Sequence, residues 1–119
     1  MNDPQLLSAQ RIFEAIAEYR KAIEQDPNRA DVLVLRASAR HAEGRKADAR
    51  ADLERALGVY PDYPEALVER GAMKLEAGDK AGAAADWQQV LRDAPDSDAG
   101  SAARAHLAEL GQTTKAGVR

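Results

Sequence analysis

Residues 30–63 read ADVLVLRASARHAEGRKADARADLERALGVYPDY, and residues 64–97 read PEALVERGAMKLEAGDKAGAAADWQQVLRDAPDS. Aligned without gaps, the two segments are identical at 12 of 34 positions, whereas typical residue frequencies would give roughly two or three identities by chance. Pro27, Pro61 and Pro95 keep the same spacing of 34 residues. A fixed period of this length is typical of proteins in which similar units stack on their neighbours.

Each repeated segment has the pattern of two helices separated by a glycine. Apolar residues recur three and four positions apart, and alanine, the best helix former, occurs 26 times in the chain. No segment alternates apolar and polar residues over a sustained length, so we expect no sheet. The pattern predicts helices over residues 30–43 and 46–59, with a break at Gly44, and over residues 64–77 and 80–93, with a break at Gly78.

The two ends of the chain extend this organisation. Upstream, we expect a partial repeat that forms one long helix from about Pro4 to Gln25, and downstream a single helix that ends at Gly111. The sequence therefore predicts one domain over residues 1–110 and a flexible tail over 111–119. Within the domain we expect a partial repeat (1–29), two full repeats (30–63 and 64–97) and a capping helix (98–110).

The spacing resembles that of the tetratricopeptide repeat, in which a large residue, small residues at fixed offsets and a proline recur. The matching positions are Leu33, Arg36, Ala37, Arg40, Ala49, Leu53, Ala56 and Pro61 in the first full unit, and Leu67, Arg70, Gly71, Lys74, Ala83, Trp87, Val90 and Pro95 in the second. The resemblance implies an all-α fold, an α-solenoid of antiparallel helix pairs with about six helices. It also makes Trp87 a core residue, with ligand stacking as the alternative.

The chain departs from the family pattern at two positions in each unit. Arginine replaces the usual apolar residue at positions 36 and 70, and a cation, Arg40 or Lys74, replaces the usual aromatic residue. Aspartate follows each of these arginines by 16 residues, at positions 52 and 86. We expect an interhelical ion pair in each unit, a partly buried clip that fixes helix orientation. The alternative is a pair that the carboxylate of a ligand opens.

Composition excludes several classes of protein. The chain has 119 residues, with 17 Lys and Arg against 20 Asp and Glu and a formal net charge of −3. Nonspecific nucleic-acid binding rests on clustered positive charge, so we expect no nucleic-acid partner. The absence of cysteine excludes disulfides, thiolate metal sites and a cysteine nucleophile. Since no apolar run is long enough to span a bilayer, we expect no direct membrane insertion.

Residues that could carry catalysis are scarce. His41 and His106 lack the paired spacing of a metal site, and the segment from Gly78 to Gly82 does not match a phosphate-binding loop. The serines have no base at a known motif spacing. We therefore expect no catalytic residues, no metal, no cofactor and no enzymatic activity.

The resemblance implies that the first helices of the units line a concave face, which binds an extended or helical segment of a partner protein. Such a scaffold would use a groove formed by Asp31, Val34, Leu35, Ser38, His41, Glu65, Val68, Glu69, Ala72, Leu75 and Glu76. The second set is acidic around an apolar strip and lacks the Lys and Asn residues with which some co-chaperone members clamp a terminal carboxylate. We expect a partner segment with basic and apolar side chains instead.

A second hypothesis is a self-associating assembly module, for which a homo-oligomer is possible. Residues 78–110, which include ADWQQVL at 85–91, resemble the soluble repeat domain of a c-type cytochrome assembly factor. The N-terminus lacks the basic-then-apolar order of a signal peptide, so we expect a cytoplasmic protein. The alternative is that the chain is the soluble part of a longer or anchored protein.

Overall fold

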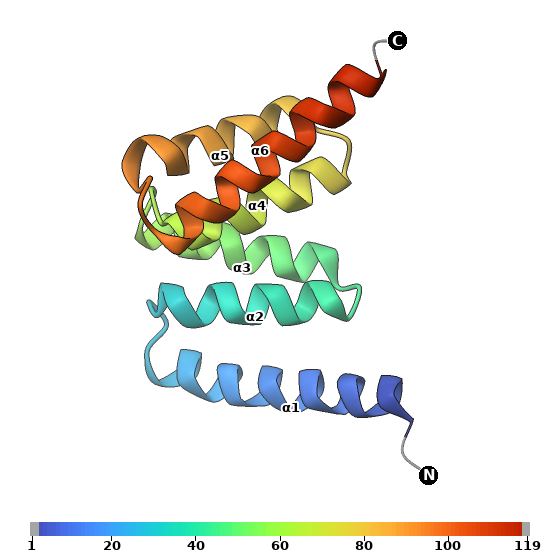
Figure 1. Cartoon of the computed structure of the whole chain (residues 1–119). Coiled ribbons are helices and arrows are strands. Elements are labelled where there is room, and N and C mark those ends of the chain that lie inside the picture. The colour runs from blue at the N-terminus through green and yellow to red at the C-terminus, as the bar shows by residue number, and fades with distance from the viewer. Residues whose placement is uncertain (1–2, 118–119) are drawn as a thin grey trace. The chain divides into compact units, whose positions relative to one another are not determined.

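The computed structural model describes the backbone of residues 3–117 and the side chains of residues 3–111. Within these residues the chain forms six helices and no strand (Figure 1). The helices are α1 (Pro4–Gln25), α2 (Ala30–Ala42), α3 (Lys46–Val59), α4 (Pro64–Glu76), α5 (Lys80–Asp93) and α6 (Asp98–Gly117). The expected all-α architecture of helical repeats is confirmed.

Two glycines end the first helices of the two full repeats, as the sequence predicted. Gly44 and Gly78 have φ angles of 82° and 90°, a left-handed conformation that side chains with a Cβ rarely adopt. The residue after each glycine then donates its N–H to a carbonyl of the helix, at 2.9 Å from Arg45 to Arg40 and at 2.8 Å from Asp79 to Lys74. These turns reverse the chain, so that α2 and α3 form one antiparallel pair and α4 and α5 another (Figure 1).

The helix starts are encoded by proline and aspartate. Asp3 accepts a hydrogen bond from the N–H of Gln5 at 2.9 Å, and Pro4 occupies the first turn of α1, where its missing N–H removes no helical bond. Asp79 caps α5 in the same way by accepting from the N–H of Gly82 at 2.8 Å. The long first helix predicted over Pro4–Gln25 is confirmed at both ends.

The chain divides into two compact units at the junction of the two full repeats. Unit 1 spans Met1–Pro61 and unit 2 spans Asp62–Arg119. In unit 1, α2 packs against both α1 and α3. In unit 2, α4 packs against α5, and α6 packs against both of them. Contacts between sequence neighbours dominate in each unit, as is typical of repeat proteins.

Small and aliphatic side chains fill the core of each unit at the positions that the repeat pattern predicted. In unit 1 the buried predicted positions are Leu33, Ala37, Ala49, Leu53 and Ala56, and in unit 2 they are Leu67, Gly71, Ala83, Trp87 and Val90. Because alanine and glycine have short or absent side chains, the paired helices can approach closely.

Trp87 is the largest core side chain and organises unit 2. Its side chain is fully buried, and its indole N–H donates to the carbonyl of Val68 on α4 at 3.2 Å. The ring stacks on His106 of α6, with ring centroids 4.8 Å apart and an interplanar angle of 15°. A Cβ on Gly71 would lie 2.5 Å from the indole nitrogen, so this position accepts only glycine without rearrangement. The predicted core role of Trp87 is confirmed.

The last helix differs from the prediction in length and in the face that it buries. α6 continues through Gly111 to Gly117, so the expected end at residue 110 is wrong, and residues 118–119 lie outside the described residues. A glycine in a helix interior costs about 1 kcal/mol relative to alanine, which weakens a helix without ending it. The buried positions are Ala99 and Ala103, which lie on the same side of the helix as His106.

Candidate functional site

A cluster of three charged side chains joins α2 to α3 in unit 1. The Nε and Nη2 atoms of Arg36 donate to the two carboxylate oxygens of Asp52 at 2.9 and 2.7 Å. Arg40, one helical turn further along α2, donates from Nη1 to Oδ2 of the same carboxylate at 2.9 Å. The Asp52 side chain is only 4% exposed. The predicted ion pair is confirmed, and it is bidentate, the geometry in which arginine binds carboxylates most strongly.

The same arrangement recurs in unit 2. Arg70 donates from Nε and Nη2 to the two oxygens of Asp86 at 2.9 Å each, and Nζ of Lys74 lies 3.1 Å from Oδ2. Burial by itself would raise the pKa of Asp86, but the hydrogen bonds from Arg70 and Lys74 outweigh it and hold the pKa below its ordinary value. The carboxylate therefore stays ionised, and it ties α4 to α5 beneath the exposed face of α4.

The second cation of each cluster is what the sequence prediction missed. Arg40 and Lys74 were recognised as departures from the repeat pattern, but each was left without a partner. The available signal was the spacing, because residues four positions apart share one helix face. Arg36 and Arg40 therefore reach the same carboxylate, as do Arg70 and Lys74.

The predicted groove residues of unit 2 form a single stripe along α4, since they recur three and four positions apart. Glu65 and Glu76, at the two ends, are exposed. The positions between them are partly exposed: Val68, Glu69, Ala72 and Leu75. The stripe therefore presents three carboxylates around an apolar centre. The indole of Trp87 fixes the backbone of this helix at Val68.

The predicted groove residues of unit 1 do not all face outward. Asp31, Ser38 and Leu35 are exposed, and His41 is partly exposed. Val34 is 9% exposed and belongs to the buried core, so its place among the binding residues is not supported. The helical period explains this result, because Val34 follows Leu33, which is fully buried and sets the inward direction of α2.

Asp31 already has an intramolecular partner on the exposed surface of α2. Arg29 donates to its two carboxylate oxygens at 2.9 and 2.8 Å. The hydrogen bond from Arg29 lowers the pKa of Asp31, so the group is ionised at neutral pH. This pair is a second example of bidentate geometry, but it is about half exposed on both sides. It therefore serves as a solvent-exposed counterpart of the buried clusters.

The described residues were also searched for other kinds of site. Among residues 3–111, no group of three or more His, Asp or Glu side chains is placed to hold a metal ion. Over the helices that the structure describes, none has the length and apolar character needed to cross a membrane.

Comparisons with known proteins agree with the repeat architecture. Two family models described as tetratricopeptide repeat match residues 6–68 and 65–97, and the first match alone covers more than half of the chain. No curated protein matches the sequence. The similar solved structures include "First TPR of Spaghetti (RPAP3) bound to HSP90 peptide SRMEEVD", with a TM-score of 0.75 and 25% identity. That match covers 93% of this chain and 86% of the other.

Proposed function

Because the chain belongs to the tetratricopeptide repeat family, we propose that it is a protein-interaction module that binds a partner segment along the exposed face of α4. The partner segment carries basic and apolar side chains. The observation behind this proposal is the stripe on α4, in which Glu65, Glu69 and Glu76 surround Val68 and Leu75. An apolar strip between like charges attracts a segment of opposite charge and similar amphipathicity.

The packing beneath α4 favours recognition by a preformed surface. The Asp86 cluster and the bond from Trp87 to Val68 hold α4 against α5 from below. A rigid helix loses little conformational entropy when a partner binds, so more of the contact energy appears as affinity. The partly exposed side chains at Val68 and Leu75 would be covered by the partner's apolar residues.

The similar solved structure suggests a general mode of binding but a different charge preference. That protein was solved with the peptide SRMEEVD, which has three acidic residues and one basic residue. On this chain the α4 stripe is itself acidic, and like charges brought together disfavour a complex. A short peptide is therefore the expected kind of ligand, whereas a peptide rich in glutamate is the wrong kind for this face.

Reversing the charge of the α4 stripe is expected to abolish the preference for basic peptides. The test uses a capped peptide with leucines spaced among lysines, and a matched peptide with glutamate in place of each lysine. For the double variant Glu65→Lys and Glu69→Lys, we expect the affinity for the basic peptide to fall about tenfold or more, since two attractions become repulsions. Fluorescence anisotropy of the labelled peptides measures the affinities.

The matched control carries the same change in net charge elsewhere in unit 2. The double variant Asp93→Lys and Glu109→Lys alters exposed residues of α5 and α6 and is expected to bind the basic peptide nearly as tightly as the parent chain. Raising the salt concentration from about 0.05 to about 0.5 M should weaken binding by the parent chain, because salt screens exposed charges. Equal affinity for both peptides, or equal affinity at both salt concentrations, would contradict the proposal.

Self-association is a second candidate function, because α1 exposes large apolar side chains. Leu6 and Phe13 are 67% and 69% exposed, and Leu7 is 37% exposed. Large exposed apolar residues on one element are typical of interaction surfaces. If α1 mediates assembly, the mass measured by sedimentation should rise over about a hundredfold range of protein concentration, and Leu6→Gln with Phe13→Gln should suppress the rise. A constant monomer mass would exclude this function.

A further inference from the structure

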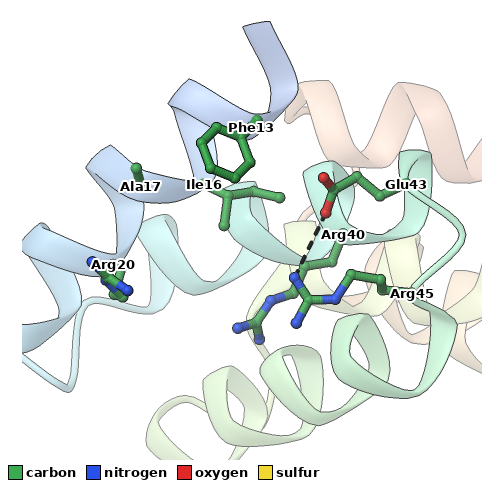
Figure 2. A pocket seen from close by; sticks show the side chains of 7 residues that line it. All are labelled: Phe13, Ile16, Ala17, Arg20, Arg40, Glu43 and Arg45. Carbon is green, nitrogen blue, oxygen red and sulfur yellow. Dashed lines mark ion pairs between the residues drawn. The ribbon is translucent and has the colours of Figure 1, made fainter. Parts of the chain in front are cut away.

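Unit 1 contains a pocket of about 300 Å³ between α1 and the end of α2. One wall is apolar and consists of Phe13, Ile16 and Ala17 from α1. Figure 2 shows Phe13 and Ile16 projecting from α1 toward the segment that contains Arg40 and Arg45. This volume is at the lower end of the range for ligand pockets. It therefore suits one or two side chains of a partner.

The other wall of the pocket is rich in arginine. Arg20, Arg40 and Arg45 line it together with one carboxylate, that of Glu43. Glu43 lies 3.6 Å from Arg45, the ion pair drawn in Figure 2. Three guanidinium groups against one carboxylate give the lining an excess of positive charge.

Arg40 adds a second, independent observation. Arg36 and Arg40 share the single carboxylate of Asp52, so this cluster holds two cations for one anion. The Nε–H of Arg40 is buried and donates to no acceptor in the part of the chain that the structure describes. A buried donor without an acceptor is unusual in a folded protein. The cluster therefore leaves positive charge and hydrogen-bonding capacity uncompensated beside the pocket.

The chemistry of this pocket does not follow from the repeat pattern. At the offset of 34 residues, Phe13 corresponds to Ala47, Arg20 to Glu54 and Arg45 to Asp79. The repeat thus requires neither the aromatic side chain nor the two outer guanidinium groups. These three residues are particular to the first unit, and they line the same pocket.

We propose that this pocket binds an acidic segment of a partner protein. One apolar side chain of the segment packs against Phe13 and Ile16, while neighbouring side-chain carboxylates pair with Arg20 and Arg45 and offset the surplus charge at Arg40. Guanidinium groups pair with carboxylates through strong, directional hydrogen bonds, and the apolar wall adds a requirement for a hydrophobic neighbour. The site lies in unit 1 and selects the charge opposite to that expected for the α4 stripe.

The first test is a titration of the full chain with capped peptides, so that peptide termini make no contribution. The probe has one leucine flanked by glutamates. One matched peptide replaces the glutamates by glutamine, and another replaces the leucine by alanine. We expect each matched peptide to bind at least about fivefold more weakly than the probe. In heteronuclear NMR spectra, the amide signals of Phe13, Ile16, Glu43 and Arg45 should shift on addition of the probe.

Two variants remove exposed parts of the pocket without touching the core. The side chain of Arg20 is 70% exposed and that of Phe13 is 69% exposed as a residue, so neither change should unfold unit 1. We expect Arg20→Gln and Phe13→Ala each to weaken binding of the probe about three- to tenfold. The matched control is Arg11→Gln, which removes the same charge from the opposite side of α1. It should leave the affinity nearly unchanged.

A third variant should change the affinity in the opposite direction. Glu43 supplies the carboxylate of the pocket lining and would repel an acidic ligand, so Glu43→Gln is expected to tighten binding of the probe about two- to fivefold. This gain cannot come from a loss of folding. Charge reversal at Glu65 and Glu69 on α4 should leave binding of the probe unchanged, so failure of this proposal and failure of the α4 proposal are distinguishable.

Several results would overturn the proposal. They are no detectable binding of the probe, equal losses for Arg20→Gln and Arg11→Gln, and no tightening for Glu43→Gln. A further contradicting result is concentration-dependent self-association that Phe13→Ala suppresses while the probe does not compete with it, since a second copy of the chain would then occupy the pocket.

Discussion

Replacing Trp87 with alanine is expected to lower the free energy of unfolding by about 3–5 kcal/mol, the usual cost of removing a large buried aromatic side chain. Trp87 is fully buried, donates to the carbonyl of Val68 and stacks on His106. The substitution therefore removes contacts with both α4 and α6 and leaves that carbonyl without its donor. Urea unfolding followed by far-UV circular dichroism measures the loss. A loss below about 1 kcal/mol would contradict the central position of this residue.

Gly71 provides the control, because its effect should depend on Trp87. In the parent chain, Gly71→Ala places a Cβ 2.5 Å from the indole nitrogen, and we expect destabilisation by about 1–3 kcal/mol through overpacking. In the Trp87→Ala background the obstacle is gone. The same change should then stabilise α4 by up to about 1 kcal/mol, since alanine is a better helix former than glycine. Additive effects of the two substitutions would show that the contact is not the cause.

The fold could be predicted from the sequence because periodicity and turn chemistry agreed. The repeat fixed the spacing of the helices, and Gly44 and Gly78 adopt the left-handed conformation that ends a helix. Their C-terminal ends lie within one residue of the prediction. The final helix lacked such agreement. Gly111 has no left-handed backbone, and alanines surround α6, so the residue types did not reveal which face would be buried.

The candidate site was less predictable, because helix spacing gives a face but not its depth. The stripe on α4 followed from spacing alone, yet Val34 on α2 proved to be buried. The pocket beside Phe13 could not be predicted, since it depends on the packing of α1 against the end of α2. The sequence did contain one unused signal, the replacement by Phe13, Arg20 and Arg45 of residues that differ in the following repeat.

Neutralising Asp86 is expected to be the most destabilising change of a single polar group in unit 2. Asp86→Asn keeps the shape of the side chain but leaves Arg70 and Lys74 facing each other without an anion. Their side chains are only 22% and 17% exposed, so water compensates them incompletely. Removing one partner of a buried ion pair costs about 3–5 kcal/mol, and the partial exposure of the cations lowers our expectation to about 2–4 kcal/mol at neutral pH.

The loss should depend on pH in a defined direction. The pKa of Asp86 in the folded chain lies below its ordinary value of 3.8, because the bonds from Arg70 and Lys74 outweigh the effect of burial. A group with a lowered pKa in the folded state contributes its stability above the unfolded pKa and loses it as the pH falls through the folded pKa. The difference in unfolding free energy between the parent chain and Asp86→Asn should therefore be largest at neutral pH and shrink below pH 3.8.

Asp31 offers a matched control with the same bidentate geometry at the surface. Arg29 holds Asp31 at 2.9 and 2.8 Å, but the two side chains are 47% and 54% exposed. Asp31→Asn should cost at most about 1 kcal/mol, the usual value for exposed pairs with a small contribution from the helix terminus. Urea titrations at neutral and acidic pH compare the two variants. If both lose the same stability, burial does not strengthen the cluster.

A triple replacement separates the stability of the cluster from its role in orienting the helices. Apolar residues of similar volume often replace a buried ionic cluster with no loss of stability, so Arg70→Met, Lys74→Leu and Asp86→Leu together are expected to restore most of the stability lost in Asp86→Asn. Bidentate bonds fix direction, whereas apolar contacts tolerate sliding of one helix along another. If the cluster sets the orientation of α4, the stable triple variant should still bind basic peptides more weakly than the parent chain. Unchanged affinity would show that packing around Trp87 is sufficient to orient that helix.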